Sequence, residues 1–188
     1  MIQEVIVTTQ NSEGMTHIAP MGVHISQNEF IILPFRPSTT LNNILQSKSA
    51  VINYCDDVRV FAGCLTGRKD WPLTATKKVP GHYISSALAH KELKLNRIED
   101  DETRPKLYCT AVYTVNHAPF LGYNRAQFAV LEAAILTSRL HILPLEKIES
   151  EIAYLNIGFT KTAGDKEREA WGWLMTIIEK HKQELKKA

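Results

Sequence analysis

Two kinds of hydrophobic pattern divide this chain, and the order in which they occur limits the folds it can adopt. Up to about residue 115, apolar and polar residues tend to alternate, as in 2–9 and 93–98, which is typical of half-buried strands. From about residue 124 onward apolar residues recur at helical spacing, for example Phe128, Leu131 and Ile135. Strands followed by helices favour an α+β fold or a barrel covered by helices, and argue against a doubly wound parallel sheet.

The expected elements follow from these patterns and from the turn residues between them. Strands are predicted at 2–9, 16–26, 30–34, 50–54, 82–98 and 106–115, with a loop over 68–80. Helices are predicted at 39–48, from Asn124 onward, at 146–156 and at 165–187, with a helical turn after Asp56 or Asp57. The last two long strands are expected to close a barrel.

Length and composition exclude several classes of protein. A chain of 188 residues with 44% hydrophobic residues can bury a substantial core, as one large domain or as a domain with a helical annex. The formal charge of +2 provides no electrostatic footprint for nucleic acid. The sequence contains neither a long apolar run nor a charged leader, so we expect neither a membrane span nor a signal peptide. Three scattered cysteines without CxxC or HExxH spacing predict a reduced, cytoplasmic chain without a metal site.

The segment Phe35–Asn43, FRPSTTLNN, has the features of a phosphate site. Arg36 precedes three hydroxyl residues, Ser38, Thr39 and Thr40, where a helix is expected to begin. The first amides of a helix are unpaired donors with a partial positive charge, and a guanidinium matches phosphate oxygens. The plainer alternative is that Ser38 or Thr39 only caps the helix and that Arg36 is a solvated surface residue.

The preceding strand, Thr16–Val23, is rich in small residues. Ala19, Pro20 and Gly22 leave room for a planar ring to approach the backbone. A proline within a strand also indicates an edge or a bulge, where backbone groups are free to meet a ligand. The alternative is an ordinary barrel strand with a bulge.

Taken together, the segments HIAPMGV, FRPSTTLNN and NRAQFAVLEAAILTSR resemble the FMN-binding split-barrel superfamily of flavin-reductase-like proteins. The resemblance covers nearly the whole chain and is greatest to a small branch of unassigned function in archaea and methylotrophic bacteria. It implies a mainly β (α+β) fold, a split β-barrel with a C-terminal helical annex. It also predicts a barrel core at 1–123 and a helical region at 124–188, packed on the barrel as part of the same domain.

The same resemblance implies FMN as the cofactor, in a homodimer with a site at the interface that both chains line. The residues implied to hold the phosphate are Arg36, Ser38, Thr39 and Thr40. Those implied to face the isoalloxazine ring are His17, Ile18, Ala19, Pro20 and Met21. Asn53 is expected near the ribityl chain or the ring edge, and Asn124 and Arg125 at the same or the partner's site. For the last two residues, a helix cap and a surface charge are the plainer interpretation.

The function expected from this resemblance is that of an FMN-dependent oxidoreductase with an unidentified substrate. No catalytic residue is identified, and the absence of GxGxxG leaves the electron donor open. Two alternatives are a flavin-binding carrier or sensor without turnover, and a non-catalytic split-barrel dimer. Glu132, within an apolar run, is expected to form an ion pair with Arg139, with an acid–base role as the alternative. The seven histidines are interpreted as isolated structural residues.

Overall fold

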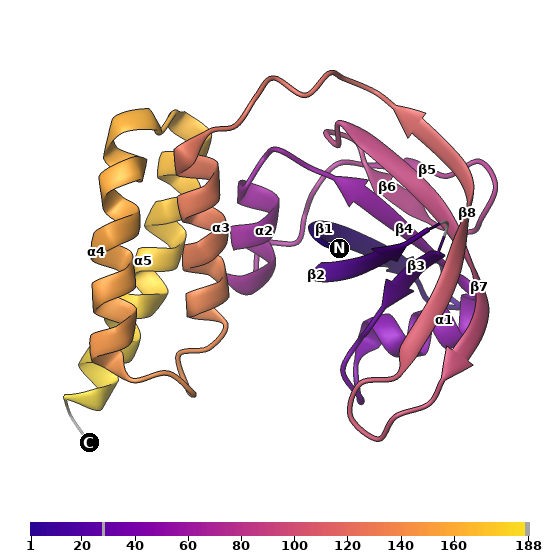
Figure 1. The fold of residues 1–188 in the computed structure, drawn as a ribbon, viewed down its shortest axis with the longest axis horizontal. Coiled ribbons are helices and arrows are strands. Elements are labelled where there is room, and N and C mark those ends of the chain that lie inside the picture. Colours follow the sequence, from indigo (N-terminus) through magenta and orange to yellow (C-terminus); the bar gives the residue numbers. More distant parts are fainter. Residues whose placement is uncertain (28, 187–188) are drawn as a thin grey trace. The chain divides into compact units, whose positions relative to one another are not determined.

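The computed structural model describes residues 1–27 and 29–186 (Figure 1). Its strands are β1 (Ile2–Gln10), β2 (Thr16–Ser26), β3 (Glu29–Ile32), β4 (Ser49–Tyr54), β5 (Leu73–Ala75), β6 (His82–Ile84), β7 (Ala89–Glu99) and β8 (Lys106–Asn116). Its helices are α1 (Thr39–Ser47), α2 (Arg59–Leu65), α3 (Arg125–Thr137), α4 (Leu145–Thr162) and α5 (Asp165–Leu185). The predicted order of strands before helices is confirmed.

The described chain divides into two compact units. The barrel unit contains residues 1–55 and 70–120, and the helical unit contains residues 56–69 and those from 121 onward. The structure therefore groups α2 with the C-terminal helices, whereas the sequence placed it within the barrel core. The predicted domain division at residue 123 stays a prediction.

Six antiparallel strands of the barrel unit form a closed barrel in the order β1-β2-β3-β8-β7-β4, and β4 pairs again with β1. Alternate residues of each strand face the interior, where Val5, Val7, Val23, Ile52 and Leu93 pack together. Helix α1 contributes Leu41 and Ile44 to this core and lies at one end of the barrel in Figure 1. The start of α1 is thus attached to a rigid scaffold.

One predicted strand is wrong in its extent. Residues 82–98 form two strands, β6 and β7, and the predicted loop at 68–80 contains β5, which pairs with β6. The chain turns after Ile84, whose backbone N–H donates to Asn53 Oδ1 at 2.7 Å. Ile84 is fully buried, so the β5–β6 hairpin covers the outer face of β4, the face turned away from the barrel core.

The helical unit has a separate core built largely from alanines of α3. Ala129, Ala133 and Ala134 are buried against α4 and α5, which lie beside α3 in Figure 1. Phe159 of α4 stacks on Trp171 of α5 with ring centroids 4.4 Å apart. In the part of the chain that the structure describes, no helix is both long and apolar enough to cross a membrane.

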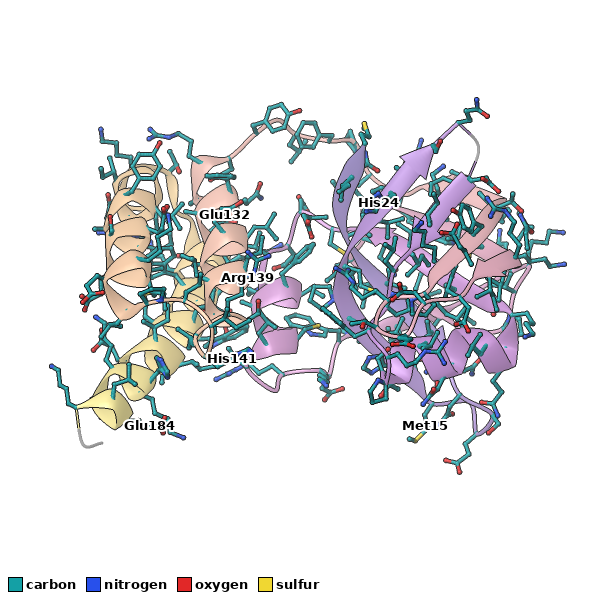
Figure 2. All side chains as sticks on the ribbon, turned by 60° about the horizontal axis from the view of Figure 1, so that its bottom comes forward. Met15, His24, Glu132, Arg139, His141 and Glu184 are labelled. Atoms are coloured by element: carbon teal, nitrogen blue, oxygen red, sulfur yellow. The ribbon has the colours of Figure 1, made fainter. Side chains whose placement is uncertain are left out.

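The prediction of an ion pair between Glu132 and Arg139 is wrong. Among the described residues these two side chains form no ion pair, and Figure 2 shows them at separate positions. Helix α3 ends at Thr137, so Arg139 lies beyond the helix face that the spacing assumed. Glu132 is half-exposed and needs no buried partner.

Candidate functional site

The loop that leads into α1 is held by the turn between β7 and β8. The backbone N–H of Arg36 donates to Thr103 O at 2.8 Å, and Arg104 Nη2 donates to Leu33 O at 3.0 Å. Arg36 Nη2 also donates to Asp100 Oδ1 at 2.6 Å, where the side chains are 43% and 81% exposed. Because exposed ion pairs are worth little, the Arg36 guanidinium can exchange Asp100 for a phosphate.

The first turn of α1 has hydrogen-bond donors available. Ser38, one of the two residues predicted as the cap, caps the helix, and its Oγ accepts from the backbone N–H of Leu41 at 3.2 Å. Within residues 1–27 and 29–186, the hydroxyls of Thr39 and Thr40 make no hydrogen bond, and their amides precede the first intrahelical bond. The first turn contains no acidic residue. These donors and the adjacent Arg36 suit an anion.

The predicted ring-binding strand does not present all five of its residues on one face. Ile18 pairs with Thr8, and Pro20 with Ile6, so both side chains lie on the outer face of the barrel. The side chains of His17, Ala19 and Met21 point to the other side, and Met21 packs partly against the barrel core. A ring on the outer face would therefore meet two side chains and the strand backbone.

A hydrogen bond connects α1 to the strand beside β2. Asn43 Nδ2 donates to Thr9 Oγ1 at 3.0 Å, and Thr9 is the register partner of His17. Helix α1 also contacts β2 directly. The structure thus brings the predicted phosphate and ring segments into one part of the barrel unit.

Asn53 has a structural role within the barrel unit. Its side chain is fully buried, and Nδ2 donates to Ile6 O at 3.1 Å and to Thr8 Oγ1 at 3.2 Å. Its Oδ1 accepts from Ile84 N. These bonds join β1, β4 and β6. Contact between Asn53 and FMN stays a prediction, and it would require these bonds to be exchanged.

Asn124 begins α3 as the predicted cap. Its Oδ1 accepts from the backbone N–H groups of Ala126 at 2.7 Å and Gln127 at 3.4 Å. Its Nδ2 donates to Thr162 O at 3.2 Å, and Thr162 Oγ1 accepts a second bond from Ala126 N at 3.0 Å. The start of α3 is therefore tied to the last turn of α4.

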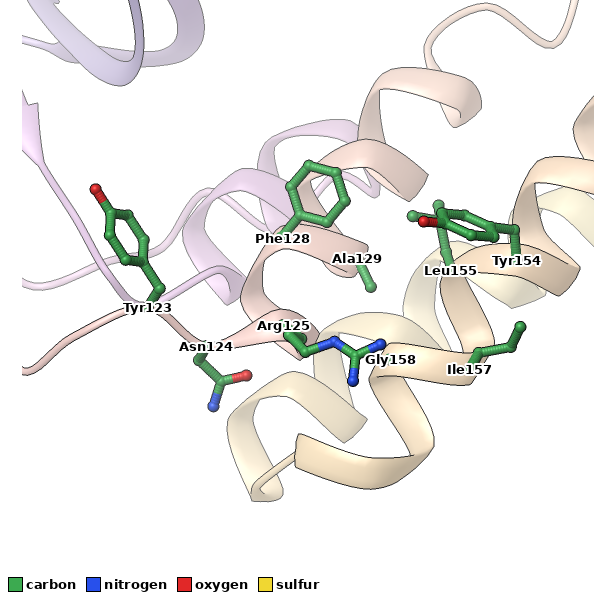
Figure 3. A pocket seen from close by; sticks show the side chains of 9 residues that line it. All are labelled: Tyr123, Asn124, Arg125, Phe128, Ala129, Tyr154, Leu155, Ile157 and Gly158. Atoms are coloured by element: carbon green, nitrogen blue, oxygen red, sulfur yellow. The ribbon is translucent and has the colours of Figure 1, made fainter.

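A pocket of about 200 Å³ lies beside this helix start (Figure 3). Its lining residues are Tyr123, Asn124, Arg125, Phe128, Ala129, Tyr154, Leu155, Ile157 and Gly158. The Arg125 side chain reaches toward Gly158 in Figure 3, and a Cβ at that glycine would lie 3.3 Å from Arg125 Nε. In the described chain, Arg125 forms no ion pair. The predicted site residues thus divide between the barrel unit and a pocket of the helical unit.

Sequence reasoning missed a buried polar cluster in the barrel unit. Glu92 is fully buried, and its carboxylate accepts from the amides of Lys77 at 2.7 Å, Lys78 at 2.5 Å and Val79 at 3.0 Å. Its Oε1 lies 3.4 Å from His90 Nε2. Only alternation in β7 places these two side chains on one face, and no motif spacing could have identified their partners.

Two further aromatic rings complete this cluster. His90 Nδ1 lies 2.8 Å from Nε2 of the exposed His117, and the Tyr83 ring stacks on both imidazoles with centroids 4.0 and 5.0 Å apart. Burial lowers the pKa of His90, although the hydrogen bond to Glu92 opposes this effect. Burial would raise the pKa of Glu92, but the three amide bonds outweigh it and hold that pKa below its usual value. The pair is therefore a carboxylate and a neutral imidazole.

The described chain contains no group of residues suited to a metal ion, and two of its cysteines are not activated thiols. No group of three His, Cys, Asp or Glu residues within 1–27 and 29–186 is placed to hold a metal ion. Burial raises the pKa of Cys64 to about 11 and that of Cys109 to about 12, so both are thiols at neutral pH.

Comparison with solved structures identifies the architecture. An FMN-bound protein from Methanosarcina mazei superposes with a TM-score of 0.80 at 18% identity, over 94% of both chains. A 2-nitrobenzoate 2-nitroreductase from Pseudomonas fluorescens gives a TM-score of 0.53 at 23% identity, over 61% of this chain and 64% of that one. Nitrilotriacetate monooxygenase component B from Bacillus cereus gives 0.52 at 16% identity, over 65% and 73%.

These likenesses show the fold, a split β-barrel with C-terminal helices, which confirms the predicted fold class. A search of curated proteins found no significant match. Two family models match consecutive parts of the sequence. They are described as protein of unknown function (DUF447) N-terminal domain, at residues 3–118, and protein of unknown function (DUF447), at residues 124–176. The chain therefore belongs to the DUF447 family.

Proposed function

We propose that this protein binds FMN at the start of α1 and uses the flavin in an oxidoreductase reaction. The observation that carries this proposal is the set of unpaired donors on the exposed Thr39 and the buried Thr40, beside the exchangeable guanidinium of Arg36. A flavin phosphate would accept from these groups with little rearrangement of the barrel. The proposal is supported by the FMN-bound protein from Methanosarcina mazei, which this chain matches over 94% of its length.

In this proposal, each segment of the barrel unit has a role. Arg36, Ser38, Thr39 and Thr40 hold the phosphate, with Ser38 acting mainly as the cap that shapes the helix start. The segment His17–Met21 meets the ring through its backbone and through outward side chains such as that of Pro20. When bound, FMN supplies reversible two-electron chemistry, and the protein supplies orientation and hydrogen-bond donors. Redox turnover is supported by the nitroreductase and monooxygenase component that share the barrel.

A homodimer with FMN at the interface is part of the same proposal. Tyr123 is fully exposed, and Phe128 and Tyr154 are 55% and 69% exposed around the Arg125 pocket. Large apolar side chains grouped on a surface favour burial against another molecule. Arg125 would then contribute its charge to the FMN site of either chain. Sedimentation velocity of the protein with and without FMN tests the dimer, and a monomer in both conditions would contradict it.

An absorbance spectrum of the purified protein tests cofactor binding, followed by titration of the flavin-free protein with FMN. Flavin absorbance that stays with the protein through gel filtration is expected. Anaerobic addition of NADH or NADPH then tests the donor, and photoreduction followed by a screen of electron acceptors tests turnover. Rapid reoxidation by a small molecule supports the enzyme, whereas bound FMN that no acceptor reoxidises supports the carrier or sensor. Protein that binds no FMN contradicts the proposal and leaves a non-catalytic split barrel.

A further inference from the structure

Helix α3 is apolar on two opposite faces. Its alanines form the core of the helical unit on one face, whereas Phe128, Leu131 and Ile135 recur at helical spacing on the other. Phe128 is 55% exposed, Leu131 and Ile135 are partly exposed, and none of the three belongs to that core. Because a helix that is apolar all round is normally covered all round, the second face of α3 requires a covering surface.

Two opposite charges flank Phe128 on this second face. Arg125 and Glu132 lie three residues before and four residues after it, so the three side chains follow one stripe. Among the described residues neither Arg125 nor Glu132 forms an ion pair. The two residues are about 10 Å apart along the helix axis, so their charges do not meet within one chain. We call the surface formed by Arg125, Phe128, Leu131, Glu132 and Ile135 the α3 face.

Helix α4 extends the α3 face on one side. Tyr154 and Ile157 are 69% and 53% exposed, and they line the pocket of about 200 Å³ together with Phe128. Figure 3 shows the rings of Phe128 and Tyr154 projecting from the two helices, with the small, buried residues Ala129 and Gly158 at the same pocket. A grouped, exposed apolar surface indicates a protein contact, in which aromatic rings and arginine contribute most of the binding energy.

The spacing of the two charges matches a symmetric pair of helices. In a twofold symmetric dimer every contact occurs twice, so a residue that faces a second residue is faced by it in return. The midpoint between residues 125 and 132 falls between Phe128 and Ala129. If a twofold axis passes there and the two α3 helices run antiparallel, each charge lies about 5 Å from the axis along its helix. Arg125 of each copy then faces Glu132 of the other.

We propose that two copies of this chain associate through the α3 face, with Arg125 of each copy paired to Glu132 of the other and both Phe128 rings at the axis. The inference rests on the homodimer of the proposed function, and it names the surface and the contacts that form it. Helix axes about 8–10 Å apart bring an arginine within reach of a facing carboxylate. The guanidinium has five N–H donors, so a carboxylate that accepts from two of them leaves the others for a flavin.

Charge reversal tests the pairing in flavin-free protein, with the dimer Kd measured by sedimentation velocity over a dilution series. Arg125→Glu and Glu132→Arg should each raise this Kd by at least about tenfold, because like charges then face each other twice in the dimer. The variant with both changes restores opposite charges and should return the Kd close to the wild-type value. Arg139→Glu makes the same change of charge beyond the end of α3 and is the matched control, which should leave the Kd unchanged.

Disulfide trapping tests the register of the two helices. Arg125→Cys and Glu132→Cys in one chain place two thiols about 10 Å apart along α3, too far for a bond within that chain. In the antiparallel pair, facing Cα atoms lie roughly 4–6 Å apart, which is within the range of a disulfide. Mild oxidation should therefore give a covalent dimer of the double variant on a non-reducing gel. The wild type and the two single-cysteine variants are the controls and should give none.

Each outcome decides the proposal. A wild-type protein that is monomeric with and without FMN would overturn the α3 face together with the homodimer. A dimer whose Kd is unchanged by either single charge reversal, or not restored by both together, would overturn the α3 face and leave the homodimer intact. Covalent dimers from a single-cysteine variant but not from the double variant would overturn the register. Failure to bind FMN would refute the proposed cofactor alone, because association is measured without flavin.

Discussion

Two helix starts in this protein each have a polar cap residue, but the groups of their first turns have different partners in the structure. At α3, the cap Asn124 and the hydroxyl of Thr162 together satisfy the first amides and join α3 to α4. At α1, the cap Ser38 accepts one amide bond, and the donors of Thr39 and Thr40 stay available beside Arg36. The first arrangement fastens two helices, whereas the second is suited to an external anion. A polar helix start thus indicates a ligand only where its donors remain available.

The largest expected effect is a loss of FMN affinity when Arg36, beside the start of α1, is replaced, and it distinguishes this helix start from that of α3. Arg36→Ala should weaken FMN binding by about 1.5–3 kcal/mol, the range for a hydrogen bond to a charged group, or roughly 10- to 150-fold in Kd. Asp100→Asn is the matched control, because it removes the competing partner of Arg36 and should leave affinity equal or higher. Fluorescence titration measures both. An unchanged Kd in Arg36→Ala would remove this residue from the site.

A smaller effect is expected when the start of α3 is altered, and it should appear in the free energy of unfolding rather than in FMN affinity. Asn124→Ala removes the cap of α3 and the bond to Thr162, so the free energy of unfolding should fall by about 1–2 kcal/mol. FMN affinity should change far less than in Arg36→Ala. Urea denaturation and FMN titration of the same variant test this. Weakened FMN binding without loss of stability would instead make Asn124 a direct ligand.

Removal of the cap of α1 should affect both stability and FMN binding. Ser38→Ala removes one bond to Leu41 N, and the expected loss of stability is about 0.5–1 kcal/mol. FMN binding should also weaken, because the helix start that holds the phosphate becomes less ordered. Thermal unfolding with and without FMN measures both effects. Full affinity in a destabilised Ser38→Ala protein would show that the phosphate does not depend on this turn.

The smallest expected effect concerns the Arg125 pocket. Gly158→Ala places a methyl group 3.3 Å from Arg125 Nε, and the exposed arginine can move by the few tenths of an ångström required. Alanine is favoured over glycine within a helix by up to about 1 kcal/mol, so stability should rise slightly. Urea denaturation is the measurement. A clear destabilisation would show that Arg125 is held rigidly against α4.

Much of the fold could be predicted because periodicity and caps act locally. The alternation in β1 and β7 and the caps Ser38 and Asn124 depend on neighbours in the sequence, and the structure confirms them. The break between β6 and β7 could not be predicted from alternation. It depends on Ile84 reaching Asn53, a contact between residues 31 positions apart.

The contacts of side chains in the candidate site could likewise not be predicted where they join distant parts of the sequence. A polar residue in an apolar strand, such as Asn53, can bind a ligand or join strands, and only its three-dimensional partners decide which. His90 and His117 looked isolated because 27 positions separate them, yet their rings are hydrogen-bonded. A cap contained within one segment, such as Ser38, can be predicted from sequence, whereas a side-chain cluster assembled across strands cannot.

Comparison of FMN with riboflavin tests the central claim most directly, because riboflavin has the same ring and ribityl chain but lacks the phosphate. Isothermal titration of the flavin-free protein should give FMN an affinity at least about tenfold higher than riboflavin. Arg36→Ala should remove most of that difference. Equal binding of the two flavins by the wild-type protein would contradict a phosphate site at the start of α1.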